Sequence, residues 1–405
     1  MALMFFVCQA VSAETLPQGN FALRNHQLLQ KLLLEHGKES PQYNPQKRPY
    51  VVCDWDNTSV FGDTEETLTY YMLTNLRYPF TVSEFRRNIS LNIPQGPSKL
   101  RNDKGIPVVF VDLLNDMVDD YRHIYNNYIG FSGKKTLAEI RQTEEFKDLA
   151  AKLFVMFDAL EATSGTALAD RWQGQLITGM TSEQVMGLSK SSIQENLGAE
   201  LRKIKLSGSR TLSRRSNDVS STTFQGLRVY PDMANLYQTL MDNGIDVYIV
   251  SASPEDIIIP IVCSKEYGYG IPREHVFGAK FVKNNGMLQP ELSPDRSMTW
   301  GAGKVDLIRR EIIAQKGYDP VLVCGDSDGD YNMLSDFPGT KLGLIVNRLK
   351  KGLTGALSSQ AHRELDHPAP RYIVQGINEN TGAFNASEYT VKFGTNKKQL
   401  LQQGE

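Results

Sequence analysis

Two aspartates, Asp54 and Asp56, follow a short apolar run at the start of the segment Tyr-Val-Val-Cys-Asp-Trp-Asp-Asn-Thr, residues 50–58. Side chains two residues apart on an extended chain point to the same side, so one strand end can hold both carboxylates together. Crowded carboxylates repel each other unless a cation or a shared proton relieves them. The pair therefore indicates a metal site, acid–base chemistry or an ordinary exposed turn, and the rest of the chain must decide between these.

Three further polar groups follow predicted strands or begin a predicted helix. Ser251 follows the run 246–250, Lys304 lies near the start of a helical segment, and Gly-Asp-Ser-Asp-Gly-Asp at 325–330 follows the run 320–324. Each has an ordinary explanation when taken alone: a turn serine, a solvated lysine, and a calcium-loop fragment that lacks the terminal glutamate of an EF-hand. Together they are expected to meet Asp54 and Asp56, because parallel strands present their carboxyl ends at one edge of a sheet.

The elements that must position these groups alternate between strands and helices, which predicts an α/β fold with a doubly wound parallel sheet. Asn284-Asn285-Gly286 indicates a hairpin between 275–282 and 287–288. The other predicted elements are helices at 21–36, 231–243, 254–267 and 303–316, strands at 50–54, 246–250, 320–324 and 342–346, and strand-like pieces at 371–375 and 388–393.

The tract at 65–205 has a mostly helical pattern, and with 405 residues the chain is long enough for two domains. We expect a helical cap with its return linker at 63–225, inserted after the first strand. The α/β core takes the remainder, 14–62 and 226–405, with an N-terminal helix and a C-terminal extension. Within the cap, 92–107 is expected to be a polar loop, and the Ser/Arg-rich segment 207–223 a flexible return crossing.

The composition is that of an ordinary globular protein, with 40% hydrophobic residues and a formal charge of −2. No basic excess indicates a nucleic-acid partner, and no stretch beyond the N-terminus approaches the length of a membrane span. Cys53, Cys263 and Cys324 remain if the leading segment is removed, an odd number that argues against a disulfide framework. Cys53 and Cys324 are expected in the core.

The first 13 residues are apolar and end in Val-Ser-Ala, as a signal peptide does before its cleavage site. They lack the usual positive leading segment. This pattern favours export to the periplasm or the medium, with a cytoplasmic location as the alternative.

In their order, Asp54-Trp-Asp-Asn-Thr58, Ser251, Lys304 and Gly325-Asp326 with Asp330 resemble the four motifs of the haloacid dehalogenase superfamily. The resemblance covers a core at about 50–62 and 226–348, with 65–205 as the inserted cap. It implies a phosphatase rather than a dehalogenase, because dehalogenases have no use for the second aspartate.

The resemblance implies a role for each motif residue. Asp54 would be the nucleophile that forms an aspartyl-phosphate, and Asp56 the general acid and base. Thr58, Ser251 and Lys304 would bind the phosphoryl oxygens. Mg²⁺ would be held by Asp54, Asp326, Asp330 and the backbone carbonyl of Asp56, an all-oxygen set suited to a hard cation.

The substrate is expected to be a small phosphorylated amine or alcohol. The segments near Asp54 and at 375–382 are similar to bacterial phosphorylcholine phosphatases, and the compact last motif fits the phosphoserine phosphatase-like branch equally well. Glu65 and Glu66 are candidates to meet a substrate ammonium group, or they simply favour the start of a helix. Nearby aromatic residues would bind a quaternary ammonium through cation–π contacts or pack in the core.

Two other functions stay open at this stage. A phosphotransferase would pass the phosphoryl group to an alcohol instead of water. A non-catalytic exported ligand-binding protein would keep the fold without turnover, although the complete set of motif residues argues against it.

Overall fold

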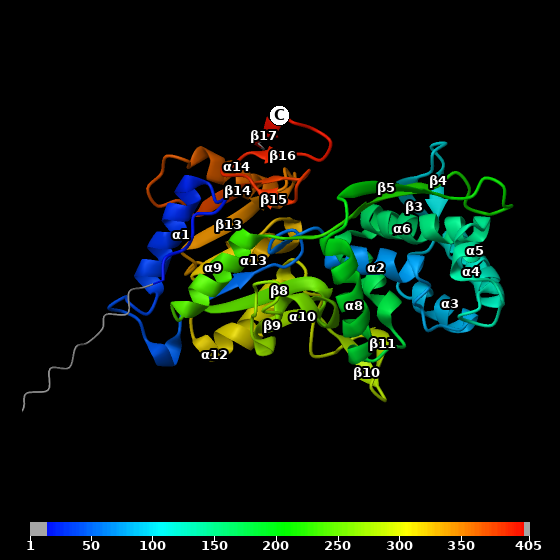
Figure 1. Ribbon diagram of the computed structural model, residues 1–405, viewed down its shortest axis with the longest axis horizontal. Helices are drawn as coiled ribbons and strands as arrows, with labels where there is room; N and C mark the ends of the chain where they lie inside the picture. Colours follow the sequence, from blue (N-terminus) through cyan, green and yellow to red (C-terminus); the bar gives the residue numbers. More distant parts are fainter. Residues whose placement is uncertain (1–13, 401–405) are drawn as a thin grey trace, which may run out of the picture.

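The protein is described here by a computed structural model covering residues 14–400, so the expected signal peptide at 1–13 lies outside the described residues. A nine-stranded, mostly parallel sheet forms the centre of one half of the molecule, which lies on the left in Figure 1. The strand order is β17-β16-β14-β13-β12-β1-β8-β9, with β15 beside β14. The strands are β1 Tyr50–Cys53, β8 Asp246–Pro254, β9 Val276–Ala279, β12 Leu322–Gly325, β13 Leu342–Asn347, β14 Tyr372–Asn378, β15 Ala383–Phe384, β16 Thr390–Val391 and β17 Lys398–Gln399. The predicted doubly wound α/β fold is confirmed.

Strand β1 lies between β8 and β12, and its alternating residues enter two different cores. Val51 pairs in parallel register with Val247 on one side and Leu322 on the other. Val51 and Cys53 pack into one buried cluster, whereas Tyr50 and Val52 pack into another on the opposite face. Because both faces of β1 are buried, its sequence is continuously apolar and does not alternate between apolar and polar residues.

Helices cover both faces of this sheet. One face carries α1 Leu23–His36, α9 Pro231–Asp242 and α10 Glu255–Val262, and the other carries α11 Ala302–Leu307, α13 Tyr331–Ser335 and α14 Leu353–Arg363. The predicted helix at 303–316 is interrupted, because a π-helical turn at Ile308–Ile313 separates α11 from α12 Ala314–Lys316. The helix predicted at 254–267 ends five residues earlier, before the left-handed glycines Gly268 and Gly270 turn the chain.

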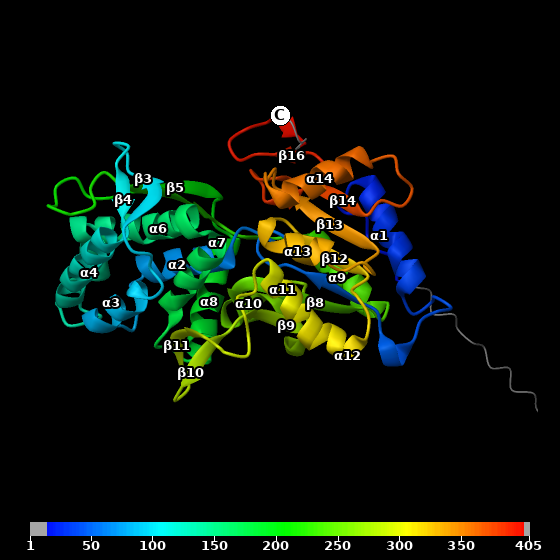
Figure 2. The same cartoon turned by 180° about the vertical axis from the view of Figure 1, so that it is seen from behind.

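The chain leaves the sheet layer after β1 and returns before α9, and two short strands, β2 Val60–Phe61 and β7 Arg228–Val229, pair at this crossing. Between them lies a helical layer with its own buried cluster, seen on the right of Figure 1 and from behind in Figure 2. Its helices are α2 Thr64–Thr74, α3 Val82–Ser90, α4 Phe110–Asn127, α5 Leu137–Arg141, α6 Glu144–Ser164, α7 Thr166–Gly174 and α8 Ser182–Leu197.

Two segments of this layer differ from the sequence expectation. The expected polar loop at 92–107 contains an antiparallel pair, β3 Pro97–Arg101 and β4 Pro107–Val109. The expected flexible crossing at 207–223 is also ordered, since β5 Arg202–Ser207 pairs with β6 Ser220–Gln225.

The loop between β5 and β6 is held by buried carboxylates that lie far away in the sequence. The amide of Ser209 donates to Asp148 at 2.8 Å, and the amide of Ser216 donates to Asp116 at 2.7 Å. Lys152, fully buried, forms ion pairs with both aspartates. Local composition cannot reveal such partners, which explains why a Ser/Arg-rich segment reads as a linker.

The hairpin expected at Asn284-Asn285-Gly286 is confirmed as β10 Phe281–Asn284 and β11 Met287–Leu292. Asn285 and Gly286 both have positive φ, 49° and 79°, as a type I′ turn requires. Phe281 and Leu288 pack in the buried cluster of the helical layer, so this hairpin joins the layer although its sequence lies between core elements.

The remaining sequence expectations concern cysteines and membrane spans. Cys53, Cys263 and Cys324 are free thiols, and Cys53 and Cys324 are buried as expected. Among the helices at residues 14–400, none is long and apolar enough to cross a membrane.

Candidate active site

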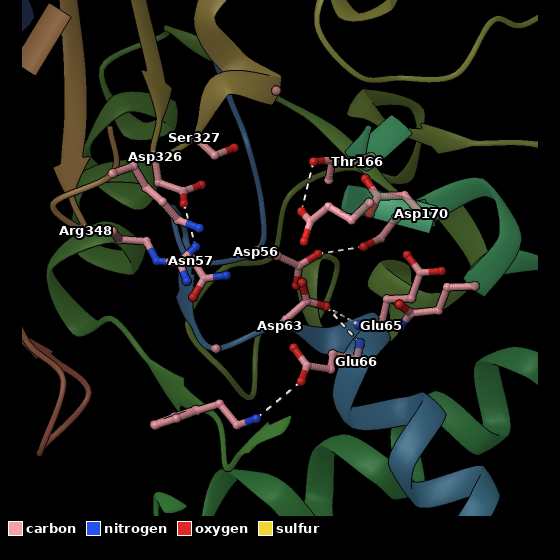
Figure 3. Close-up of a pocket in the computed structure, with 18 of the residues that line it drawn as sticks. Asp56, Asn57, Asp63, Glu65, Glu66, Thr166, Asp170, Asp326, Ser327 and Arg348 are labelled. Atoms are coloured by element: carbon pink, nitrogen blue, oxygen red, sulfur yellow. Dashed lines mark hydrogen bonds and ion pairs between the residues drawn. The ribbon is translucent and has the colours of Figure 1, made fainter. Parts of the chain in front are cut away.

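The motif residues meet at the carboxyl ends of β1, β8 and β12, which are neighbours in the sheet. Asp54, Asp56, Ser251, Lys304 and Asp326 all line one cavity of about 450 Å³, which also receives residues of the helical layer. Figure 3 shows part of this lining, with Asp56 lying between Arg348 on one side and Asp170 on the other. The structure thus brings together groups that are more than 270 residues apart in the chain.

Asp54 is buried and forms close contacts with two of the other motif residues. Lys304 donates from Nζ to Asp54 Oδ1 at 2.6 Å, and the Thr58 hydroxyl donates to Asp54 Oδ2 at 3.1 Å. Burial and the charge of Asp330 raise the pKa of Asp54, whereas Lys304 opposes that rise. Burial disfavours the charge of Lys304 itself, but Asp330 and Asp54 outweigh it and raise the pKa of this lysine. Lys304 therefore stays charged and restrains the carboxylate that would act as nucleophile.

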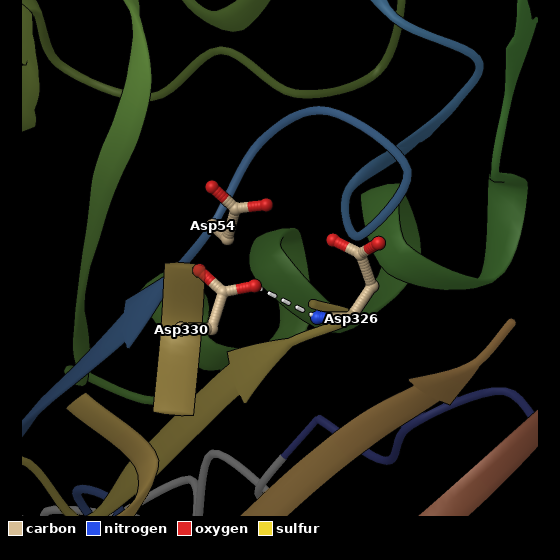
Figure 4. Close-up of side chains that lie close together, drawn as sticks. All are labelled: Asp54, Asp326 and Asp330. Atoms are coloured by element: carbon tan, nitrogen blue, oxygen red, sulfur yellow. Dashed lines mark hydrogen bonds between the residues drawn. The ribbon is translucent and has the colours of Figure 1, made fainter. Parts of the chain in front are cut away.

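Asp54, Asp326 and Asp330 form a compact group of buried carboxylates (Figure 4). One oxygen from each lies within 4.8 Å of the others. Lys304 also donates to Asp330 Oδ1 at 2.7 Å, and Arg348 donates to Asp326 Oδ2 at 2.8 Å. Three negative charges thus face two positive ones, which leaves a negative, all-oxygen site of the kind that suits a hard divalent cation.

Asp330 is held more tightly than the other two carboxylates. Its Oδ2 accepts the amides of Asp326 at 2.9 Å and Ser327 at 3.1 Å, while its Oδ1 accepts Lys304. These bonds orient the loop that carries Asp326. Asp54 and Asp326 are therefore the side chains best placed to hold Mg²⁺ directly, and Asp330 would act mainly by fixing Asp326 and Lys304.

The carboxylate of Asp56 lies outside this group and faces the helical layer. Its Oδ1 accepts both the amide of Thr64 at 2.7 Å and its hydroxyl at 2.6 Å, and its Oδ2 accepts the Ser253 hydroxyl at 2.7 Å. Desolvation and the charge of Asp63 raise the pKa of Asp56 to about 7, against the effect of these hydrogen bonds. The two aspartates of the opening motif therefore occupy different environments, as different chemical roles would require.

Of the two hydroxyl residues expected to bind phosphoryl oxygens, Ser251 lines the cavity, whereas Thr58 is fully buried and does not line it. Thr58 bridges Asp54 and Asp326, with its hydroxyl 3.1 Å from Oδ1 of Asp326. Ser251 is 1% exposed, and its Oγ accepts the amide of Ser253 at 3.2 Å. Both hydroxyls can turn toward a bound phosphoryl group, because a hydroxyl rotates its proton freely.

The acidic residues after Asp56 have three different environments. Asp63 caps α2, since its Oδ1 accepts the amides of Glu65 at 2.9 Å and Glu66 at 2.8 Å. Glu66 accepts the Thr223 hydroxyl and the Phe224 amide, and so ties α2 to β6. Glu65 is 6% exposed and lines the cavity, and its Oε1 has no hydrogen-bond partner among the described residues. Only Glu65 thus keeps an unused buried oxygen.

The helical layer contributes one wall of the cavity, and this wall has more acidic residues than the sequence predicted. Asp158 and Glu161 of α6 and Asp170 of α7 line the cavity with Glu65 and Glu66, and no lysine or arginine of α2, α6 or α7 lines it. Burial and the neighbouring carboxylates raise the pKa values of Glu65 and Asp170 well above normal. Helices α2, α6 and α7 thus give the cavity an acidic wall of five carboxylates and no cation, while Lys203 of β5 is a cation of the same layer that also lines it.

The sequence interpretation also missed Ser253, Arg348 and Lys350, which line the cavity. Each had a signal. Ser253 lies two residues beyond Ser251 on the same strand, and Arg348 and Lys350 follow the predicted strand at 342–346. Asp328, from the same run as Asp326 and Asp330, accepts the amide of Thr354 at 2.8 Å at the start of α14.

The aromatic residues beside Asp56 and further along the chain pack mostly in the cores. Trp55, Tyr78, Phe80, Tyr121 and Trp172 are buried in the hydrophobic clusters and do not line the cavity. Phe61, Phe154, Phe157, Phe224 and Trp300 line it instead.

Comparisons with known proteins agree with this geometry. Residues 149–335 match a family described as haloacid dehalogenase-like hydrolase, a segment that contains Ser251, Lys304, Asp326 and Asp330 but not Asp54. Phosphorylcholine phosphatase of Pseudomonas aeruginosa is 32% identical over 151 residues. That match covers 31% of this chain and 42% of the relative, so it spans less than half of that protein.

A solved structure matches nearly the whole chain. It is described as a conserved functionally unknown protein from Anaerococcus prevotii, with 30% sequence identity and a TM-score of 0.85. The match covers 94% of this chain and 99% of that one. The arrangement of sheet and helical layer is therefore similar in the two proteins over most of the chain.

Proposed function

We propose that this chain, which matches the haloacid dehalogenase-like hydrolase family over residues 149–335, is a Mg²⁺-dependent phosphomonoester hydrolase acting on a small phosphorylated amine such as phosphocholine. One observation carries the proposal. Lys304 bonds Asp54 and Asp330 together beside Asp326, while Asp56, only two residues from Asp54, turns away to Thr64 and Ser253. A single strand end thereby supplies a restrained nucleophile and a separate acid–base group.

In the first step, a carboxylate oxygen of Asp54 forms a bond to phosphorus as the bond from phosphorus to the ester oxygen breaks. Asp56 donates its proton to the departing oxygen. Lys304, Thr58 and Ser251 donate to the phosphoryl oxygens and stabilise the charge that develops on them. Bound Mg²⁺ would neutralise the phosphoryl group and the carboxylates around it.

In the second step, Asp56 accepts a proton from a water molecule whose oxygen attacks phosphorus. The bond between phosphorus and Asp54 breaks, which frees inorganic phosphate and restores the carboxylate. The same residue thus gives and recovers one proton in each cycle.

The acidic wall supports an amine as the leaving group. Glu65 has an oxygen without a partner, and burial and the charge of Asp170 raise its pKa. Burial and the charges of Asp63 and Glu161 raise the pKa of Asp170 in turn. A cation placed between these carboxylates would offset their repulsion. Phe154 and Phe157, which also line the cavity, would suit the methyl groups of a quaternary ammonium. The similarity to a protein named phosphorylcholine phosphatase points the same way.

The test is phosphate release from a panel of phosphocholine, phosphoethanolamine, phosphoserine and glycerol phosphate with Mg²⁺. We expect Asp54→Asn to reduce turnover of every hydrolysed ester by about 10³-fold or more, because it removes the nucleophile. Asp328→Asn is the matched control, since Asp328 bonds α14 and not the site. Full activity of Asp54→Asn would contradict the covalent mechanism.

Transfer of the phosphoryl group to added glycerol, in place of phosphate release, would instead identify the protein as a phosphotransferase.

A further inference from the structure

The turn after β13 brings two cations into the cavity. Arg348 and Lys350 lie two residues apart and both line the cavity. Figure 3 shows Arg348 extending toward Asp326 and Asn57, with Asp56 between it and Asp170. Neither cation belongs to the four motifs of the opening interpretation.

The structure holds this turn in an unusual conformation. Leu349, between the two cations, has φ of 57°, a left-handed conformation that leucine rarely adopts. The Asn347 side chain accepts the Leu349 amide at 3.1 Å and donates to the carbonyl of Glu388 at 3.0 Å. Strained backbone of this kind persists when the surroundings fix it, and it is concentrated at functional sites.

The C-terminal extension supplies those surroundings. Thr390 donates its hydroxyl to the carbonyl of Asn347, and Lys392 donates to the carbonyl of Arg348 at 3.4 Å. Lys392 itself is paired with Glu379. The extension therefore fixes the backbone of the turn that carries Arg348 and Lys350, and its own Glu379 and Lys392 line the same cavity.

The two cations form few direct ion pairs. Arg348 pairs with Asp326, and the charges of Glu379 and Glu66 also act on it at longer range. Lys350 forms no ion pair with the residues at 14–400, although the charges of Asp326 and Glu161 act on it. The charge of Arg348 and burial lower the pKa of Lys350, which reflects this crowding. If Asp326 holds Mg²⁺, its negative charge serves the metal, and the two cations have even less compensation. An oxyanion placed between them would supply it, and a guanidinium group is well shaped to bind one.

We propose that Arg348 and Lys350 form a subsite for an oxyanion other than the transferring phosphoryl group, namely a second acidic group of the substrate. This inference rests on the proposed function, which assigns the transferring group to Thr58, Ser251 and Lys304. Together with the acidic wall, these two cations would let the cavity accept a phosphate ester that carries both an ammonium and a carboxylate or second phosphate. Free inorganic phosphate has the same binding chemistry, and the experiment separates these two sources.

The experiment measures binding by calorimetry to the Asp54→Asn protein saturated with Mg²⁺, because this background needs no turnover. Phosphoserine and phosphoethanolamine are the probes, since they differ by one carboxylate. We expect phosphoserine to bind about tenfold more tightly, the size of one charge-assisted contact. Lys350→Met should abolish this preference. Lys351→Met, at the neighbouring exposed lysine that does not line the cavity, should keep it.

Inorganic phosphate is titrated in parallel into the same proteins. Loss of the phosphoserine preference in Lys350→Met supports a subsite for the substrate's second acidic group. If Lys350→Met keeps the preference for phosphoserine but binds one equivalent of inorganic phosphate fewer than the parent protein, the subsite binds the free oxyanion. The inference is overturned if Lys350→Met weakens both esters equally, if it changes neither titration, or if none of the probes binds. Absence of hydrolysis by the native chain is a separate result, which bears on the proposed function alone.

Discussion

The two walls of the cavity differ in how their charges are paired. On the sheet side, the carboxylates of Asp54, Asp326 and Asp330 each contact Lys304 or Arg348 at 2.8 Å or less. On the helical side, Glu65 has an oxygen without a partner, and the five carboxylates of α2, α6 and α7 that line the cavity face one cation of the same layer, Lys203 of β5. Carboxylates that are already paired with cations are held in position for a reaction. Carboxylates without a paired cation can instead bind a positive charge on the substrate. Under the proposed function, residues on the sheet side carry out the reaction, and residues of the helical layer select the leaving group.

Removal of the metal should have the largest effect on phosphate release, and it should act only on the residues at the sheet side of the cavity. We expect chelation of Mg²⁺ to reduce phosphate release to background for every substrate, because the repulsion among three buried carboxylates would no longer be neutralised. Activity should return when Mg²⁺ is added back. Full activity after exhaustive chelation would contradict a metal-dependent site.

Substitution of the acid–base group should have the next largest effect. Asp56→Asn keeps the hydrogen bonds to Thr64 and Ser253 within reach but cannot carry the proton. We expect kcat to fall by about 10²–10⁴-fold with little change in substrate binding. Comparing kcat and KM for the variant and the native chain checks this. A large rise in KM at unchanged kcat would show that Asp56 serves binding instead.

The sheet side could be predicted from the sequence because its signals are local. Asp54, Ser251 and Asp326 each follow an apolar strand, and a parallel sheet must bring such positions to one edge. The hairpin at Asn285-Gly286 could be predicted for the same reason, because its turn conformation is encoded by two adjacent residues.

The helical side could be predicted only in outline, because long-range contacts decide its details. The loop at 208–219 is ordered by Asp116 and Asp148, which lie at least 60 residues earlier. Glu65 and Glu66 are equivalent in sequence, yet only Glu66 meets β6, a strand about 157 residues away. Arg348 similarly depends on contacts with the C-terminal extension. None of these partners leaves a local pattern.

The most direct test of the division between the two walls is the specificity of Glu65→Gln, measured as kcat/KM for phosphocholine and for uncharged-headgroup glycerol phosphate. We predict a fall of about tenfold for phosphocholine with no change for glycerol phosphate, because only the cationic ester uses the unpaired carboxylate. Glu66→Gln, whose carboxylate contacts β6, is the matched control and should leave the ratio of the two values unchanged. Equal loss for both esters in Glu65→Gln, or no loss for either, would contradict the assignment of leaving-group recognition to the helical layer.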